Sequence, residues 1–174
     1  QSGFDISRRF GLEKEFGVRV NASYGDGEHY IDGMNDRHIS GALAADYTTD
    51  KLKINVDAYA IRDNREGGSP AMVAMGGKGS VNQVLPAPKG DLNYFPYLDG
   101  NTESKFVGLS GEYQFTPDLK TFAGIGYIEK EYNGHLFGTR MIVTNIKGDA
   151  TSQYYRVASK EKNTAVNFGL EGKF

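Results

Sequence analysis

The chain has 174 residues, with 20 Lys and Arg against 22 Asp and Glu and a formal charge of −2. This balance excludes the strongly basic surface of a nucleic-acid-binding protein, and the absence of cysteine excludes disulfides and thiolate metal sites. A content of 23 Gly, 11 Tyr and 10 Phe favours an all-β chain, and no window approaches the roughly 18 apolar residues of a membrane-spanning helix.

The first two predicted elements are strands. In the segment 4–10, Phe4, Ile6 and Phe10 share one face, and in EFGVRVNASYGDG (15–27) every second residue from Phe16 to Tyr24 is apolar or aromatic. Side chains of a strand point to opposite faces in turn, so a period of two predicts β-strands with two unlike faces.

The same alternation recurs in the segments 39–47, 51–60, 106–115, 119–129 and 164–174. It assigns each residue to a face. The apolar face is expected to carry Val18, Val20, Leu43, Ile54, Val56, Leu109, Ile125, Val166, Phe168 and Leu170. The polar face is expected to carry Arg19, Asn21, Asp57, Glu112 and Asn167.

The links between the predicted strands are of two kinds, and the kinds alternate. Short ones with turn-forming residues are LEKE (12–15), TTDK (48–51) and TPDL (116–119). Long polar ones cover about 25–37, 63–103 and 133–152. Short turns at one end and long loops at the other are typical of an outer-membrane barrel, with periplasmic turns and extracellular loops.

Charges and aromatic residues indicate which face is outside. The polar faces carry charges within the strands, and the aromatics of the apolar face gather near strand ends, as in the interfacial girdles of membrane barrels. We therefore expect the apolar face to meet lipid. A soluble β-sandwich or lipocalin-like ligand binder remains an alternative. The charged residues are Arg9, Arg19, Asp46, Asp57, Glu112, Glu171 and Lys173, and the aromatics are Phe16, Tyr24, Tyr47, Tyr113 and Phe115.

Several stretches resemble the early barrel strands of TonB-dependent siderophore receptors. They are DISRRFG, EFGVRVNASYGDG, the pair ISGALAADY and KLKINVDAY, GEYQFTPDLKTFAGIGY and NTAVNFGLEGKF, and the resemblance covers residues 4–65 and 103–174. It implies an antiparallel transmembrane β-barrel of the bacterial outer membrane, roughly 22-stranded and plugged. It also implies import of ferric siderophores with energy passed through TonB, and no enzymatic activity.

The chain departs from that family in extent. It contains no TonB box and no plug domain, so we expect residues 1–174 to be a β-barrel segment of a larger receptor, with TonB contacted through the missing plug region. If the chain after Tyr154 is one long strand, the strand count is seven. If SKEKN (159–163) is a turn, the count is eight, and a free-standing outer-membrane barrel with a structural or surface-binding role becomes the alternative.

Two aromatic groups are candidate ligand-binding residues. The loop LPAPKGDLNYFPYLDG (85–100) holds Tyr94, Phe95 and Tyr97, and a second group is Tyr154, Tyr155 and Arg156. Loop aromatics offer rigid, amphipathic contact area to a ligand, and the resemblance implies that such side chains line the extracellular vestibule. The alternative is that these rings pack loops together or belong to the outer aromatic belt.

No catalytic or metal site is expected, and no cofactor. His29, His38 and His135 lie in or beside long loops. The acidic loop DGEHYIDGMNDRH (26–38) offers ligands to a cation, but its spacing fits no EF-hand. GGKGS (76–80) lacks the spacing of a phosphate-binding loop and does not follow a strand.

Overall fold

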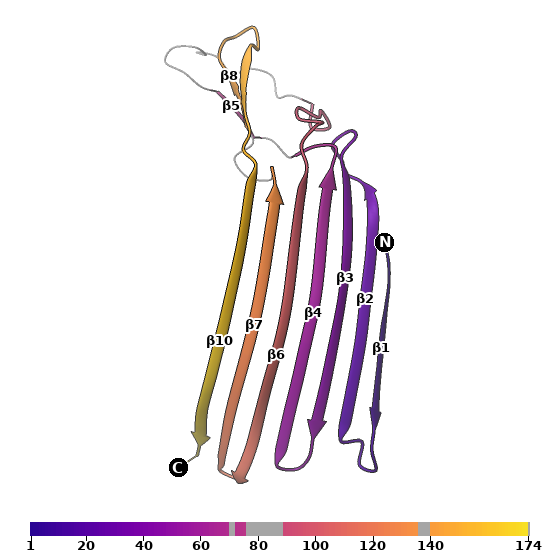
Figure 1. Cartoon of the computed structure of the whole chain (residues 1–174), viewed down its shortest axis with the longest axis vertical. Helices are drawn as coiled ribbons and strands as arrows, with labels where there is room; N and C mark the ends of the chain where they lie inside the picture. The colour runs from indigo at the N-terminus through magenta and orange to yellow at the C-terminus, as the bar shows by residue number, and fades with distance from the viewer. Residues whose placement is uncertain (70–71, 76–88, 136–139, 174) are drawn as a thin grey trace.

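The computed structural model describes residues 1–69, 72–75, 89–135 and 140–173, and its regular elements are all β-strands. Seven long strands form one antiparallel sheet in the order β1-β2-β3-β4-β6-β7-β10 (Figure 1). Over the described ranges, no helix is long and apolar enough to cross a membrane. The long strands are β1 (Ser2–Phe10), β2 (Phe16–Glu28), β3 (Asn35–Thr48), β4 (Leu52–Glu66), β6 (Gly100–Thr116), β7 (Leu119–Gly134) and β10 (Val157–Gly172).

The three short links are tight turns at one end of the sheet, as the sequence predicts. They cover 11–15, 49–51 and 117–118. In the first, Gly11 adopts a φ of 98°, a left-handed conformation that favours glycine. In the second, the Leu52 amide donates to the Thr49 hydroxyl at 3.0 Å, and the Thr49 amide donates to the Leu52 carbonyl at 2.8 Å.

The long links lie together at the other end (Figure 1). The first two are shorter than the predicted 25–37 and 63–103, because the polar residues at their borders continue the strands, whereas the third begins and ends later than the predicted 133–152. The first link covers only 29–34, so most of the predicted 25–37 loop is strand; the others cover 67–99 and 135–156. These two contain a small second sheet that the sequence did not predict. In it β5 (Met72–Met75) pairs in parallel with β8 (Arg140–Val143), which pairs with β9 (Ala150–Gln153).

The last strand decides the strand count. SKEKN (159–163) was one possible turn, and the eight-stranded alternative depended on it. That alternative is wrong: β10 runs without a break from Val157 to Gly172 and pairs with β7 along its whole length. Lys160 lies opposite Glu131 and Lys162 opposite Glu129, so these polar residues sit in a strand ladder.

The register confirms the predicted faces. Val18, Ala45, Val56, Leu109, Ile125 and Val166 lie directly opposite one another in one row across six strands. Directly paired residues point to the same side, and the other predicted apolar positions fall on that side in neighbouring rows. We call this side the apolar face and the other the polar face. On the polar face Arg9 holds Asp46 with two hydrogen bonds, of 2.7 and 3.1 Å.

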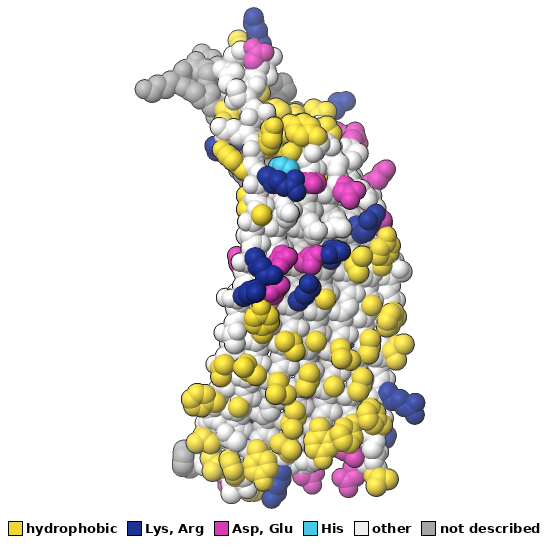
Figure 2. Space-filling model, viewed as in Figure 1, with side chains coloured by type: hydrophobic (Ala, Val, Ile, Leu, Met, Phe, Trp, Pro, Cys, Tyr) yellow, Lys and Arg dark blue, Asp and Glu magenta, His cyan; other side chains and the backbone are white. Residues whose placement is uncertain are grey.

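No described element covers the apolar face, so the sheet is a single layer. Hydrophobic side chains spread over its lower half (Figure 2). Ile6, Val56, Val107 and Phe168 are all exposed. A soluble sandwich would bury this face under a second sheet. The buried hydrophobic residues lie instead among the loop-end segments: Ile31, Met34, Phe95, Leu98 and Val143.

Candidate functional site

The two groups of candidate ligand-binding residues meet at the loop end of the sheet. Rings from both form a cluster: Phe95 and Tyr154 have centroids 6.4 Å apart, Phe95 and Tyr97 also 6.4 Å, and Tyr97 and Tyr154 5.8 Å, all edge to face. We call Phe95, Tyr97 and Tyr154 the aromatic cluster. Phe95 is 1% exposed, whereas Tyr97 is 64% and Tyr154 48% exposed. Phe95 is thus the anchor, and the two tyrosines present ring surface to the outside.

The segment that carries Phe95 is fixed by an asparagine. The Asn93 amide nitrogen donates to the Gly67 carbonyl at 2.7 Å and to the Asp32 carbonyl at 2.8 Å. Its amide oxygen accepts from the Phe95 backbone N–H at 3.1 Å. One side chain therefore ties three loop-end segments together, a role that Asn often fills in turns. The sequence places Asn93 beside the aromatic residues but gives no sign of its distant partners.

A polar group borders the aromatic cluster. His135 Nδ1 lies 3.0 Å from the Asp99 carboxylate, and Arg156 Nη1 lies 3.6 Å from the same oxygen. Arg156 also donates through Nε to the Asn133 side chain at 3.2 Å. The His135 ring lies 6.3 Å from that of Tyr154. These contacts join the end of β7 and the start of β10 to the last residue before β6.

The remaining two candidates are less involved. Tyr94 is half-buried and Tyr155 is 54% exposed. The ring contacts that join the cluster within the described residues run between Phe95, Tyr97, Tyr154 and His135. The structure thus brings together Phe95, Tyr97, Tyr154 and Arg156.

Acidic residues of the segment 26–38 form hydrogen bonds with other side chains of the sheet. Asp26 accepts hydrogen bonds from Tyr24, Asn35 and Arg37, at 2.9, 2.7 and 3.1 Å. Asp36 accepts two from Arg65, at 2.6 and 3.0 Å. Among the described residues no group of three or more His, Asp and Glu is placed to hold a metal ion. GGKGS (76–80) lies outside the described residues.

The aromatic cluster offers ring faces to a ligand. The polar group beside it adds one carboxylate, one guanidinium and one imidazole. Aromatic faces suit rigid, amphipathic ligands, and the polar groups can orient a ligand by hydrogen bonds. The arrangement of rings and polar groups is therefore suited to binding an amphipathic ligand.

Comparisons with known proteins show that the sheet is similar to segments of larger receptors. The chain is 30% identical to the "Ferrichrome receptor FcuA" of Yersinia enterocolitica over 98% of its length, and spans 22% of that receptor. It superposes with a TM-score of 0.86 on BauA, the ferric preacinetobactin receptor of Acinetobacter baumannii, at 28% identity, over 99% of this chain and 25% of BauA. The sheet matches a barrel segment of siderophore receptors. No protein-family model matches the chain.

A more distant neighbour shares this segment of fold. FpvA of Pseudomonas aeruginosa, in complex with a pyoverdine and iron, superposes with a TM-score of 0.77 at 15% identity, over 99% of this chain and 23% of FpvA. The chain thus spans about a fifth to a quarter of the length of these receptors. In all three comparisons nearly the whole of the chain is matched, so the agreement extends beyond any single hairpin.

Proposed function

We propose that these residues form part of the barrel wall of an outer-membrane receptor that imports ferric siderophores. The observation that carries the proposal is the match to BauA, because 28% identity and a TM-score of 0.86 hold over 99% of the chain. The function is transport and involves no enzymatic step. The plug and the contact with TonB belong to parts of the receptor outside residues 1–174.

The apolar face supports a position in lipid. On β6 it runs from Phe115 to Val107, roughly 27 Å along the strand at about 3.4 Å per residue. With the usual strand tilt of about 40°, this length projects to roughly 21 Å along the membrane normal, near the apolar band of about 25 Å around outer-membrane barrels. Phe16, Tyr47, Tyr113 and Phe115 are aromatic residues of this face near the short turns, where a headgroup-level girdle is expected.

The aromatic cluster supports a ligand-facing role for the loop end. In the proposed receptor, Tyr97 and Tyr154 contact the ferric siderophore, together with Tyr94, Tyr155 and Arg156. Phe95 holds the rings in place from below. Because Arg156 and His135 both lie beside the Asp99 carboxylate, they orient polar groups of the ligand without a large local excess of charge.

The test is iron uptake by cells that lack other siderophore receptors and express the whole receptor chain. We expect uptake of radioactive iron from at least one ferric hydroxamate or catecholate. The variant Tyr97→Ala with Tyr154→Ala should lower uptake about 30-fold at unchanged surface amount, since two rings that each contribute about 1 kcal/mol weaken binding by about 2 kcal/mol.

Tyr30→Ala is the matched control, because Tyr30 is a 71% exposed ring in the link 29–34, outside the aromatic cluster. It should leave uptake unchanged. Failure to take up iron from every ferric siderophore offered, with the receptor present at the cell surface, would contradict the proposal.

A further inference from the structure

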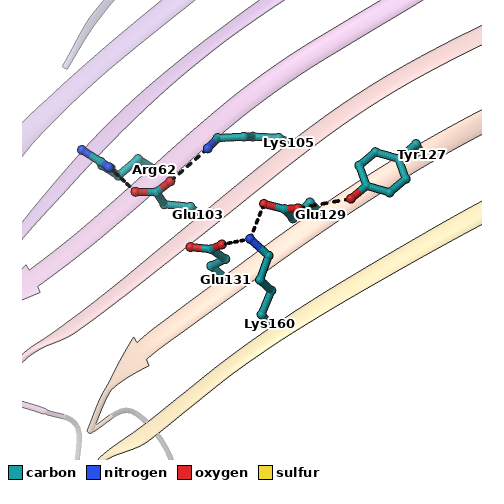
Figure 3. Close-up of polar contacts among 7 residues, drawn as sticks. All are labelled: Arg62, Glu103, Lys105, Tyr127, Glu129, Glu131 and Lys160. Carbon is teal, nitrogen blue, oxygen red and sulfur yellow. Dashed lines mark hydrogen bonds and ion pairs between the residues drawn. The ribbon is translucent and has the colours of Figure 1, made fainter.

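The apolar face ends in charged residues towards the loop end. Above the row of Val107 and Tyr127, the next row holds Lys105, Glu129 and Lys162 in direct register. The row after it holds Arg62, Glu103, Glu131 and Lys160. We call these seven residues the charged band. They lie on the same side of the sheet as the apolar residues (Figures 2 and 3).

Inside the band, carboxylates hold the cations in place. Lys160 Nζ lies 2.8 Å from Glu129 and also contacts Glu131, and Arg62 donates to Glu103 at 2.8 Å (Figure 3). Lys105 and Lys162 are held more loosely, each with Nζ 3.5 Å from a carboxylate oxygen, of Glu103 and Glu129 respectively. These two lysines thus retain donors for a further acceptor.

Two lysines are the most exposed side chains of the band. The side chains of Glu103 and Glu129 are 21% and 20% exposed, whereas Lys105 and Lys162 are 63% and 56% exposed. These two lysines are therefore more open to an approaching group than the carboxylates that they contact. Lys105 and Lys162 stand two strands apart in one row, a spacing of roughly 10 Å that long lysine side chains can span.

The position of the charged band along the strands indicates which kind of group the two lysines meet. The Tyr127 hydroxyl donates to Glu129 at 3.1 Å while its ring belongs to the row of Val107, which is the orientation of an aromatic residue at a membrane interface. Long cationic side chains at this level keep their stems on the apolar surface and their amines among the headgroups. A phosphate there offers several oxygens to amine donors.

We propose that Lys105 and Lys162, supported by Arg62 and Lys160, bind the phosphate of a lipid in the outward-facing leaflet. The inference rests on the proposed function, since that function puts the apolar face in a membrane. The lipid chains lie on the apolar rows below, and the phosphate displaces the long contacts of the two lysines.

The test uses the whole receptor chain reconstituted in phosphatidylcholine vesicles with spin-labelled lipids. Phosphatidic acid and diacylglycerol are compared, because they differ by the phosphate alone. We expect the receptor to immobilise phosphatidic acid preferentially. Lys162→Gln should lower this preference about fivefold, and Lys105→Gln with Lys162→Gln further, since one lysine near an anionic lipid surface contributes about that factor.

The matched control is Lys53→Gln with Lys130→Gln, which removes two exposed lysines from the polar face of β4 and β7. It should keep the preference for phosphatidic acid. Inorganic phosphate should not abolish the preference; if it does, the band is a free-phosphate site and the proposal is overturned. Equal immobilisation of both lipids by an inserted receptor also overturns it. A receptor that immobilises neither lipid has not entered the bilayer, and then the proposed function fails.

Discussion

Neighbouring residues of β4 point to opposite faces, and their surroundings differ accordingly. Val56 lies in the apolar row between Ala45 and Leu109, and Asn55 lies on the polar face, where its amide donates to the Ser110 hydroxyl at 3.4 Å. This difference follows from the period of two, which is why residue facing was predictable from sequence.

Val56→Arg should therefore destabilise the folded receptor in lipid by about 2–4 kcal/mol, the cost of a basic side chain near the middle of the apolar band. Asn55→Arg, one residue away, should cost less than about 1 kcal/mol because the polar face accepts charge. Urea unfolding of the whole receptor chain in lipid vesicles measures both. Equal losses for the two variants would contradict the assignment of faces.

The cluster of Phe95, Tyr97 and Tyr154 was not predictable in the same way. The sequence names all three residues as candidates, but their contacts join segments about 60 positions apart, and no local pattern specifies such a pairing. The burial of Phe95 depends on Asn93, whose partners are Gly67, at the far end of the same link, and Asp32, in the link 29–34. Tertiary hydrogen bonds of this kind are invisible to periodicity.

Phe95→Ala should loosen the loop end without unfolding the sheet. The deletion leaves a cavity worth roughly 3 kcal/mol, so the Leu98 amide, which donates to the Phe95 carbonyl at 3.1 Å, should exchange its hydrogen about 100-fold faster. Tyr97→Ala should change the rate by less than fivefold, because that ring is 64% exposed. Hydrogen exchange followed by mass spectrometry decides, and unchanged exchange after Phe95→Ala would refute the anchoring role.

The strands extend beyond the stretches in which their faces alternate. The polar residues of 25–28, 35–37 and 159–163 belong to β2, β3 and β10, although their composition is that of loops. In these stretches the side chains of both faces are polar, so the alternation is lost while the backbone ladder continues. Sequence periodicity therefore locates the limits of the apolar face rather than the ends of the strands. This is why the predicted 25–37 loop is too long and why periodicity left open whether SKEKN is a turn or part of a strand.

In the proposed receptor, the two kinds of link place opposite ends of the sheet on opposite sides of the outer membrane. Because the chain contains no cysteine, single-cysteine variants report on sidedness cleanly. Asp91→Cys, in the link 67–99, should react with a membrane-impermeant maleimide on intact cells. Asp50→Cys, in the turn 49–51, should react only after the outer membrane is disrupted. Both positions are exposed, so accessibility alone does not separate them. Labelling of Asp50→Cys on intact cells, with Asp91→Cys protected, would reverse the topology.

At the scale of the whole molecule, the sheet is one layer with two open edges. Among the described strands, β1 pairs only with β2, and β10 only with β7. Unpaired backbone groups at a strand edge are very costly in lipid, so in a membrane these edges require further strands. The coverage of about a fifth to a quarter of the related receptors agrees with a wall that is completed elsewhere.

The isolated 174 residues should therefore bind no ferric siderophore tightly. A small ligand needs a concave site that buries most of its surface, and one curved layer with the aromatic cluster at its rim encloses a ligand on one side only. Loop-end segments without further partners also lose conformational freedom on binding, which weakens affinity.

Calorimetry against ferric hydroxamates and catecholates should show no dissociation constant below about 1 μM, a threshold that corresponds to roughly −8 kcal/mol. The whole receptor chain, run in parallel, should bind at least one of them. Submicromolar binding by the isolated residues would show that Tyr97, Tyr154 and Arg156 belong to a complete site, and the interpretation of this chain as one part of a wall would have to be abandoned.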